Sequence, residues 1–304
     1  MTKRDLLSIA DLNGTEILAV LDRARRMKAG ERTTPLVGKS IALLFEKPSL
    51  RTKASFMVGI QELGGYSFYM GREEVGLGQR EPIADVARVL ARYVQGIVAR
   101  VYAHSSVVEL AKYAPVPVVN ALSDWEHPCQ TLADLQTIQE VKGKLAGVTI
   151  VFVGDGNNVS RSLALGAALV GARFVLTTPR GYEMDADTLA KARTLAKASG
   201  GEVRVVTDPK AAVAGADVLY TDVWTSMGQE EESQKRRQAF RGYTVDEALL
   251  ATAGPQAVLM HDMPAHYGEE VPPGMLDHPQ SVAFDQAENR LHAQKAALEF
   301  LLAR

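Results

Sequence analysis

The segment Phe45-Glu46-Lys47-Pro48-Ser49-Leu50-Arg51-Thr52-Lys53 changes within a few residues from an apolar strand to the polar start of a helix. The apolar run 41–45 predicts an interior strand, Pro48 ends it, and Ser49 can cap a helix that continues through Leu63. The first turn of that helix presents unpaired backbone N–H groups, hydroxyls and the cations of Arg51 and Lys53, which suits a small phosphorylated molecule. An ordinary helix cap with solvated basic residues explains the segment equally well.

Short apolar runs alternate with longer amphipathic ones along the whole chain, which predicts repeated β-α units and an α/β fold with mostly parallel sheets. The polar stretch 139–147 separates two sets of runs, so we expect two domains, 1–138 and 139–284, each a sheet flanked by helices. An amphipathic helix is predicted at 82–94, with Ile83, Val86, Leu90 and Tyr93 on the apolar face that packs against a sheet. The expected strands are 41–45, 66–70, 97–101, 116–121, 148–154, 173–178, 202–206, 218–222 and 257–261.

Composition limits the partners of the chain. Its 304 residues are 46% hydrophobic and carry a formal net charge of -2, which gives no general attraction to nucleic acid or to anionic membrane. No apolar stretch is long enough to span a bilayer, and residues 1–5 lead into a mixed polar helix, so we expect a cytoplasmic protein without membrane partners. Cys129 is the only cysteine, which excludes an internal disulfide and a multi-cysteine metal site.

His127-Pro128-Cys129-Gln130 follows the expected strand 116–121, so it lies where a parallel strand ends and the next helix begins. His127 and Gln130 are spaced to face one ligand, with His127 as donor or cation and Gln130 as neutral donor. A structural cap is the alternative for His127. Cys129 points elsewhere and is interpreted as a core residue.

The expected strand 148–154 and the turn Asp155-Gly156-Asn157-Asn158 resemble the opening of a dinucleotide site. Val159 replaces the third glycine, however, and the next strand ends at Thr177-Thr178-Pro179 without an acidic residue for a ribose. The expected fold alone keeps a dehydrogenase as an alternative. The missing glycine and the missing acidic residue count against it, so no nicotinamide cofactor is expected. Paired asparagines instead suit a zwitterion, because an amide both accepts and donates.

Two later strand ends carry polar residues. Asp222 ends the expected strand 218–222, and a long polar loop that could move over a ligand continues from there through Phe240. The other strand end is His261-Asp262-Met263-Pro264-Ala265-His266, where a turn at Pro264 splays the side chains, so we expect no metal. The first half of the chain thus offers cations and amides for an anion, and the second offers carboxylates and amides for an amine. A cleft between the halves would align the two ligands.

These motifs together resemble those of the ornithine carbamoyltransferase family. Ser49-Leu50-Arg51-Thr52-Lys53 is similar to its Ser-Thr-Arg-Thr-Arg, and His127-Pro128-Cys129-Gln130 to its His-Pro-x-Gln. Ser226-Met227-Gly228 resembles the loop that separates ornithine from aspartate enzymes, and Glu288-Asn289-Arg290-Leu291-His292 completes the set.

The resemblance implies a two-domain α/β fold with crossover helices, the C-terminal helix 285–304 completing the first domain, and a homotrimer or a multiple of trimers. It implies that carbamoyl phosphate and L-ornithine give citrulline and phosphate without a cofactor or metal. The carbamoyl-phosphate residues would be Ser49, Leu50, Arg51, Thr52, Arg100, His127, Gln130, Asp262, Met263 and Arg290. The ornithine residues would be Asn158, Asp222, Ser226 and Met227, and the catalytic residues would be Arg51, Arg100, His127, Asp222 and Asp262.

Three positions depart from the family pattern. Asp262 stands where a cysteine is usual, Lys53 where an arginine is more frequent, and Gly76 where a polar side chain is common in a loop, 71–81, that reaches a neighbouring subunit. Gln79 or Arg80 could take over the role of that missing side chain. We hypothesise that Asp262 raises the pKa of the substrate amine and moves the alkaline rise of the rate to higher pH.

These departures keep two alternatives open beside ornithine transfer. One is a carbamoyltransferase for another amine, such as putrescine or acetylated ornithine. The other is a weakly catalytic paralogue that only binds.

Overall fold

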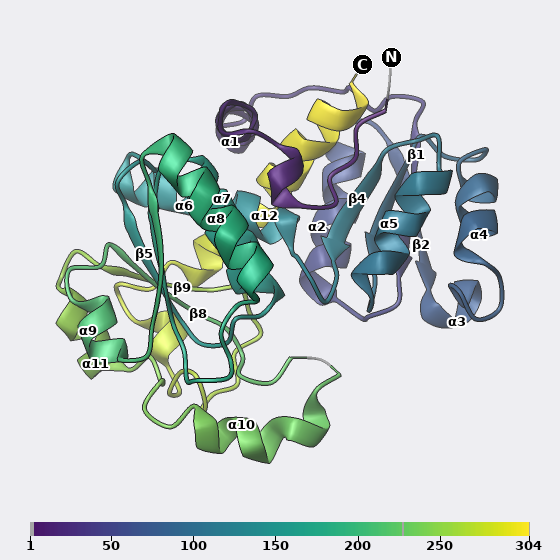
Figure 1. Cartoon of the computed structure of the whole chain (residues 1–304). Coiled ribbons are helices and arrows are strands. Elements are labelled where there is room, and N and C mark those ends of the chain that lie inside the picture. The colour runs from purple at the N-terminus through teal and green to yellow at the C-terminus, as the bar shows by residue number, and fades with distance from the viewer. Residues whose placement is uncertain (1–2, 227, 304) are drawn as a thin grey trace. The chain divides into compact units, whose positions relative to one another are not determined.

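The computed structural model describes residues 3–226 and 228–303 (Figure 1). The chain divides into two compact units. The first is Met1–Gln136 together with Glu288–Arg304, and the second is Thr137–Ala287. Two helices, α6 (Pro128–Lys142) and α12 (Ala283–Leu302), contribute residues to both units.

The first unit holds a parallel sheet of β1 (Ser40–Phe45), β2 (Tyr66–Gly71), β3 (Gly96–Arg100) and β4 (Val118–Leu122). Its spatial order is β2-β1-β3-β4. The chain therefore reverses its winding direction between β1 and β3. In open parallel sheets, ligands bind beyond the carboxyl ends of the strands at such a reversal.

Helices cover both faces of this sheet. On one face, α4 (Ile83–Leu90) and α5 (His104–Tyr113) pack against alternate residues such as Ala42 and Leu44 in one buried cluster. On the other face, α12 approaches so closely that a Cβ at Gly96 would lie 3.4 Å from Leu302. The remaining helices of the unit are η1 (Ile9–Asp11), α1 (Gly14–Lys28), α2 (Leu50–Glu62) and α3 (Arg72–Val75).

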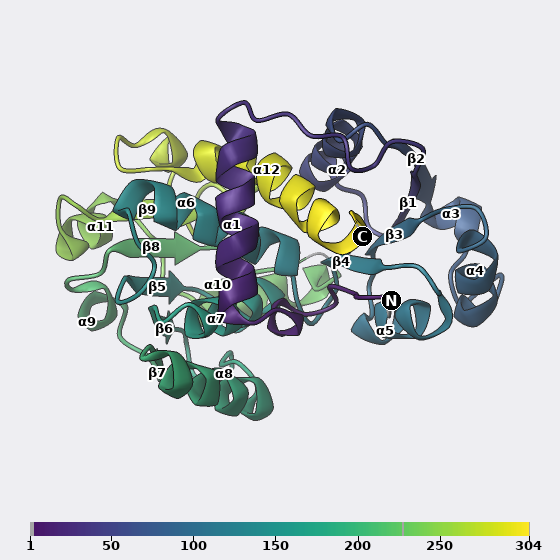
Figure 2. The ribbon, with the colours of Figure 1, turned by 90° about the horizontal axis from the view of Figure 1, so that it is seen from above.

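The second unit holds the parallel strands β5 (Thr149–Val153), β6 (Arg173–Thr177), β7 (Glu202–Val206), β8 (Val218–Thr221) and β9 (Val258–His261), several of which lie side by side in Figure 2. Their order is β7-β6-β5-β8-β9, so the reversal falls between β5 and β8. Phe152 and Tyr220 stack across these two strands with ring centroids 5.2 Å apart. The helices are α7 (Asn158–Leu169), α8 (Ala186–Ser199), α9 (Pro209–Val213), η2 (Glu230–Glu232), α10 (Ser233–Ala239), α11 (Glu247–Ala253) and η3 (Met275–Asp277).

The α/β class with two parallel sheets is confirmed, and each expected strand lies within two residues of an observed one. Two finer expectations were wrong. Tyr93 is 67% exposed because α4 ends at Leu90, before the periodic pattern does. The segment up to Phe240 is not one long loop, since η2 and α10 form within it. Among the described residues, no helix is both long and apolar enough to cross a membrane.

Candidate active site

The start of α2 is a capped helix terminus. Ser49 is the N-cap, in an extended conformation, and its hydroxyl accepts a hydrogen bond from the backbone N–H of Thr52 at 3.2 Å. The side chain of Leu50 is 78% exposed, whereas Thr52 is buried and Arg51 is half-buried. The cap and the anion site are compatible, because one side-chain cap leaves other N–H groups of the first turn available.

Two buried arginines meet at the hydroxyl of Thr52. Arg290 donates to it from Nη2 at 3.0 Å, and Arg100 donates from Nη1 at 3.5 Å. Arg100 ends β3, where the register with β4 shifts, and Arg290 comes from α12. Both side chains are at least nine-tenths buried. This concentration of positive charge lies at the β1/β3 reversal, where an anion would be strongly attracted.

Two glutamines complete the surroundings of Arg290. Gln130 accepts from its Nη1 at 2.5 Å. In the orientation that satisfies both ends of its amide, Gln294 accepts from Arg290 Nε at 3.1 Å and donates to Ser55 at 2.7 Å. Sequence reasoning missed Gln294, although its position one helical turn after Arg290 was a usable signal.

His127 lies immediately before α6 and is buried. Its carbonyl accepts from the backbone N–H of Gln130 at 3.0 Å, which fixes the start of the helix. Burial lowers the pKa of His127 well below 6.5, and the charges of Arg290 and Arg100 lower it further. The imidazole is therefore neutral near pH 7 and can form hydrogen bonds to a ligand. Of the two roles that the sequence allowed, donor or cation, the structure excludes the cation.

Cys129 is buried, as the sequence predicts, and burial raises the pKa of its thiol to about 12.

The turn after β5 organises the polar group of the second unit. Asn157 caps α7 by accepting from the N–H groups of Val159 and Ser160, both at 3.0 Å. Its Nδ2 donates to Asp222 at 2.7 Å across the β5/β8 reversal, and Asn158 stands beside it as the first residue of α7. Sequence reasoning selected Asn158 as a ligand-binding residue and missed the hydrogen bond from Asn157 to Asp222.

Gly156 in the same turn is explained by packing. A Cβ there would lie 2.3 Å from the backbone nitrogen of Met184. The glycine is thus required for close approach of two backbones, and this requirement accounts for it without a dinucleotide.

The segment that follows Asp222 is tied back to the β5 turn by Arg236 of α10. Its Nη1 donates to Asp155 at 2.7 Å and to the carbonyl of Trp224 at 3.0 Å, and its Nε donates to Glu232 at 3.1 Å. Burial raises the pKa of Asp155, and the hydrogen bond from Arg236 opposes that rise. Ser226 is half-buried within this anchored segment. Met227, which the resemblance placed in the ornithine site, lies outside the described residues.

A hydrogen-bonded pair supports the turn after β9. The backbone N–H of Met263 donates to His261 Nδ1 at 2.8 Å, so Nδ1 carries no proton and Nε2 donates to Glu270 at 3.2 Å. His261 and Glu270 are completely buried. Asp262, half-buried, places a carboxylate oxygen 3.7 Å from Nδ1 of His261. Because β8 and β9 are neighbours, Asp222 and Asp262 follow adjacent strands of one sheet.

Two of the residues that depart from the family pattern have defined local surroundings. Gly76 ends α3 in the left-handed conformation at φ 57°, and a Cβ there would lie 2.7 Å from that of Arg80. The side chains of Gln79 and Arg80 at this loop are exposed. The ammonium of Lys53 lies 3.6 Å from the ring centroid of Tyr69, a cation–π contact.

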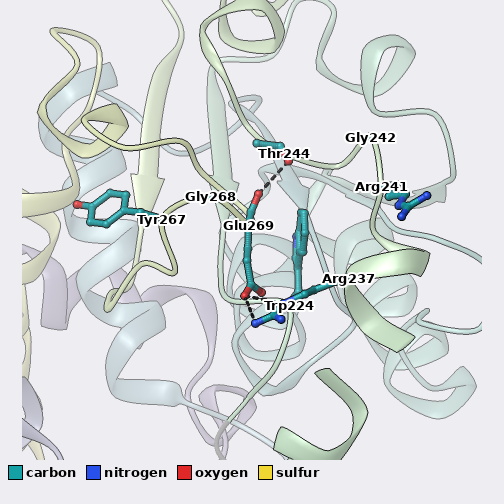
Figure 3. A pocket seen from close by; sticks show the side chains of 8 residues that line it. All are labelled: Trp224, Arg237, Arg241, Gly242, Thr244, Tyr267, Gly268 and Glu269. Atoms are coloured by element: carbon teal, nitrogen blue, oxygen red, sulfur yellow. Dashed lines mark hydrogen bonds and ion pairs between the residues drawn. The ribbon is translucent and has the colours of Figure 1, made fainter. Parts of the chain in front are cut away.

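A separate pocket of about 530 Å³ occurs in the second unit (Figure 3). The carboxylate of Glu269 pairs with Arg237 at 2.8 Å, and its carbonyl accepts from Thr244 at 2.8 Å, while Tyr267 lies apart from them. Glu269 is therefore held by Arg237 and Thr244. The lining residues are Trp224, Arg237, Arg241, Gly242, Thr244, Tyr267, Gly268 and Glu269.

His266, Glu269 and Glu270 place possible metal-ligand atoms within 4.8 Å of one another. Glu269 already pairs with Arg237, and Glu270 accepts from the side chain of His261 and the backbone N–H of His266. We therefore assign these residues no metal.

Each unit is a parallel sheet flanked by helices, and each has polar side chains where the winding direction of the chain reverses. This is the architecture of α/β proteins that bind small molecules beyond the carboxyl ends of their strands. Residues 4–140 match the family model "Aspartate/ornithine carbamoyltransferase, carbamoyl-P binding domain", and residues 146–301 match "Aspartate/ornithine carbamoyltransferase, Asp/Orn binding domain". The chain belongs to the aspartate/ornithine carbamoyltransferase family.

Relatives and solved structures agree with this membership. The chain is 52% identical to an ornithine carbamoyltransferase of Acidothermus cellulolyticus, covering 98% of this chain and 96% of the relative. The structure of ornithine carbamoyltransferase from Pyrococcus furiosus matches with a TM-score of 0.95 at 49% identity, covering 99% and 97% of the two chains. An acetylornithine transcarbamylase complexed with acetylcitrulline matches with a TM-score of 0.90 at 32% identity, covering 98% and 99%.

Proposed function

We propose that this chain is an ornithine carbamoyltransferase, which transfers the carbamoyl group of carbamoyl phosphate to the side-chain amine of L-ornithine and gives L-citrulline and phosphate. The observation that carries the choice of amine is sequence identity over nearly the whole chain. Sequence identity is 52% with the ornithine enzyme of Acidothermus cellulolyticus and 49% with that of Pyrococcus furiosus, against 32% with the acetylornithine enzyme. The structures of the last two both match this fold closely.

In this proposal carbamoyl phosphate binds to the first unit. The phosphate is held by the first turn of α2, from Ser49 through Leu50 and Arg51 to Thr52, and by Arg100. The carbamoyl group lies against His127, Gln130 and Arg290. Asp262 and Met263, which the resemblance also assigns to carbamoyl phosphate, belong to the second unit. The two buried guanidiniums at Thr52 support this placement, because they supply the charge that a phosphate requires.

Ornithine is assigned to the second unit, on Asn158, Asp222, Ser226 and Met227. The hydrogen bond from Asn157 to Asp222 supports this assignment, because it fixes a carboxylate beside the start of α7. A helix start favours the substrate carboxylate, and a fixed carboxylate favours an ammonium group.

The chemistry requires a neutral amine. A free pKa of about 10.4 makes deprotonation at pH 7 cost about 4.6 kcal/mol, at about 1.36 kcal/mol per unit. The cations that hold the phosphate and the exclusion of water lower the pKa of the amine, whereas a nearby carboxylate raises it.

Attack on the carbonyl carbon then places negative charge on oxygen, which Arg100, neutral His127 and Thr52 are positioned in our proposal to stabilise. Loss of one such donor typically costs about 2.7 to 4 kcal/mol. The leaving phosphate is the proton acceptor.

We further propose a homotrimer, or a multiple of trimers. Apolar side chains that support an interface are exposed on α2 and at the start of the edge strand β2: Met57 at 37%, Val58 at 44% and Tyr66 at 66%. Gln79 and Arg80 are exposed in the loop 71–81, and one of them would reach toward a neighbouring site. Analytical ultracentrifugation tests the assembly, and a monomer at micromolar concentration would contradict it.

The function is tested by supplying carbamoyl phosphate with ornithine, putrescine or acetylated ornithine and measuring the carbamoylated product of each. We expect citrulline from ornithine, with kcat/KM at least about 100-fold above the other two amines, because unpaired polar groups reject analogues that lack a partner. Preference for putrescine or acetylated ornithine would reassign the substrate. Carbamoyl-phosphate binding without turnover of any amine would favour a binding-only paralogue.

A further inference from the structure

Asp134 is a buried carboxylate one helical turn beyond Gln130 on α6. Its side chain is 0% exposed, and its Oδ1 accepts a hydrogen bond from Gln130 Nε2 at 2.8 Å. Both residues belong to the first unit. Residues four apart face the same side of a helix, so this contact follows directly from the spacing.

The neighbours of Gln130 determine which way its amide points. A carboxylate only accepts hydrogen bonds and a guanidinium only donates them. With Asp134 on one side and Arg290 Nη1 on the other, at 2.5 Å from Gln130 Oε1, only one orientation satisfies both contacts. The opposite orientation would place oxygen against carboxylate and N–H against guanidinium, and each of those pairs is repulsive.

We propose that Asp134 is a positioning residue that keeps the Gln130 oxygen turned toward the substrate as an acceptor. This inference rests on the proposed function, in which Gln130 borders the carbamoyl group. An amide oxygen has two lone pairs, so the acceptor that Arg290 occupies can also receive an N–H of the carbamoyl group. The same oxygen offers nothing to acetyl phosphate, which has a methyl group in that place. Asp134 therefore sets the preference of the site for carbamoyl over acetyl phosphate.

The test compares Asp134→Ala, Asp134→Asn, Gln130→Ala and the double variant Asp134→Ala/Gln130→Ala with the natural enzyme. Carbamoyl phosphate and acetyl phosphate are titrated separately, and binding is read from the shift in unfolding temperature, so the measurement does not depend on citrulline formation. Kinetics with carbamoyl phosphate give KM and kcat in parallel. Glu299→Gln is the matched control, because Glu299 is a carboxylate of the same unit that pairs with Arg23, away from Gln130.

We expect Asp134→Ala to lower the preference for carbamoyl over acetyl phosphate about 10-fold or more, the size of one charge-assisted hydrogen bond. The double variant should prefer carbamoyl phosphate no less than Gln130→Ala does, because Asp134 acts through Gln130. Asp134→Asn, which keeps an acceptor oxygen, should retain most of the preference.

Three outcomes would overturn the inference: an unchanged preference in both Asp134 variants, additive losses in the double variant, or an equal loss in Glu299→Gln. If Asp134→Ala does not fold, Asp134→Leu, which has a similar volume and no acceptor oxygen, takes its place in the same comparison. Absence of citrulline with the natural enzyme would instead count against the proposed function, while the phosphate preference would still report on Asp134.

Discussion

Asn157 Nδ2 donates to Asp222 Oδ2 at 2.7 Å, and the same asparagine caps α7 through its oxygen. The two residues are 65 positions apart in the chain and meet where the winding of the second sheet reverses. One side chain therefore couples the start of a helix to the direction of a carboxylate. Asp222 is 7% exposed, so its orientation depends on such contacts and not on solvent.

Asn157→Asp separates the two roles of this residue. Aspartate caps a helix as well as asparagine does, so we expect a stability change below about 1 kcal/mol. It has no N–H donor, however, and places a second carboxylate beside Asp222, so KM for ornithine should change at least about 10-fold.

Steady-state kinetics with varied ornithine measures this change. Asp246→Ala is the control, because Asp246 caps α11 through the N–H of Leu249 and its loss should lower stability without affecting KM. An unaltered KM in Asn157→Asp would contradict the positioning of Asp222 by Asn157.

His127 should make the protein less stable in acid. Its folded pKa lies well below 6.5, so the unfolded chain binds more protons on this residue between that pKa and 6.5. Stability therefore falls as pH drops below about 6.5, by about 1.4 kcal/mol per pH unit from this one group. Urea unfolding at pH 5.5 to 8 should give a steeper pH dependence for the natural chain than for His127→Gln. Parallel curves would show that His127 is not held neutral.

Strand ends and helix starts were predictable because the relevant signals are local. Apolar runs locate the strands, and Pro48 with Ser49 locates the beginning of α2. Pairings between distant residues, such as Arg290 with Gln130 or Asn157 with Asp222, depend on which strands become neighbours, which no local pattern encodes. The sequence also could not distinguish a charged from a neutral His127, because the pKa depends on burial and on two arginines from other elements.

Asp262 should shift the pH dependence of the rate if it lies near the substrate amine. A carboxylate favours the ammonium form, raises the pKa of the amine and moves the alkaline rise of kcat/KM to higher pH. Asp262→Asn should move that rise about one pH unit lower. Asp262→Cys should move it in the same direction at pH values below the pKa of the new thiol, where the cysteine is neutral. The pH-rate profile with ornithine measures the shift. Superimposable profiles for all three proteins would refute the role of Asp262.

Arg236 should stabilise the second unit far more than its neighbour Arg237. The Arg236 side chain is 7% exposed and its partner Asp155 12%, so Arg236→Met leaves a buried carboxylate without its cation. Such losses typically cost about 3 to 5 kcal/mol, whereas a partly exposed pair such as Arg237 with Glu269 contributes about 0 to 1 kcal/mol.

Chemical denaturation of Arg236→Met and of the control Arg237→Met compares the two pairs. The double variant Asp155→Asn/Arg236→Met should recover part of the lost stability, because its buried carboxylate is gone. KM for ornithine should rise in Arg236→Met and stay unchanged in Arg237→Met. Arg236 ties the segment that carries Ser226 to the β5 turn through Asp155 and the carbonyl of Trp224, whereas Arg237 pairs with Glu269. Equal destabilisation by the two variants would mean that burial of the Asp155 pair does not determine its strength.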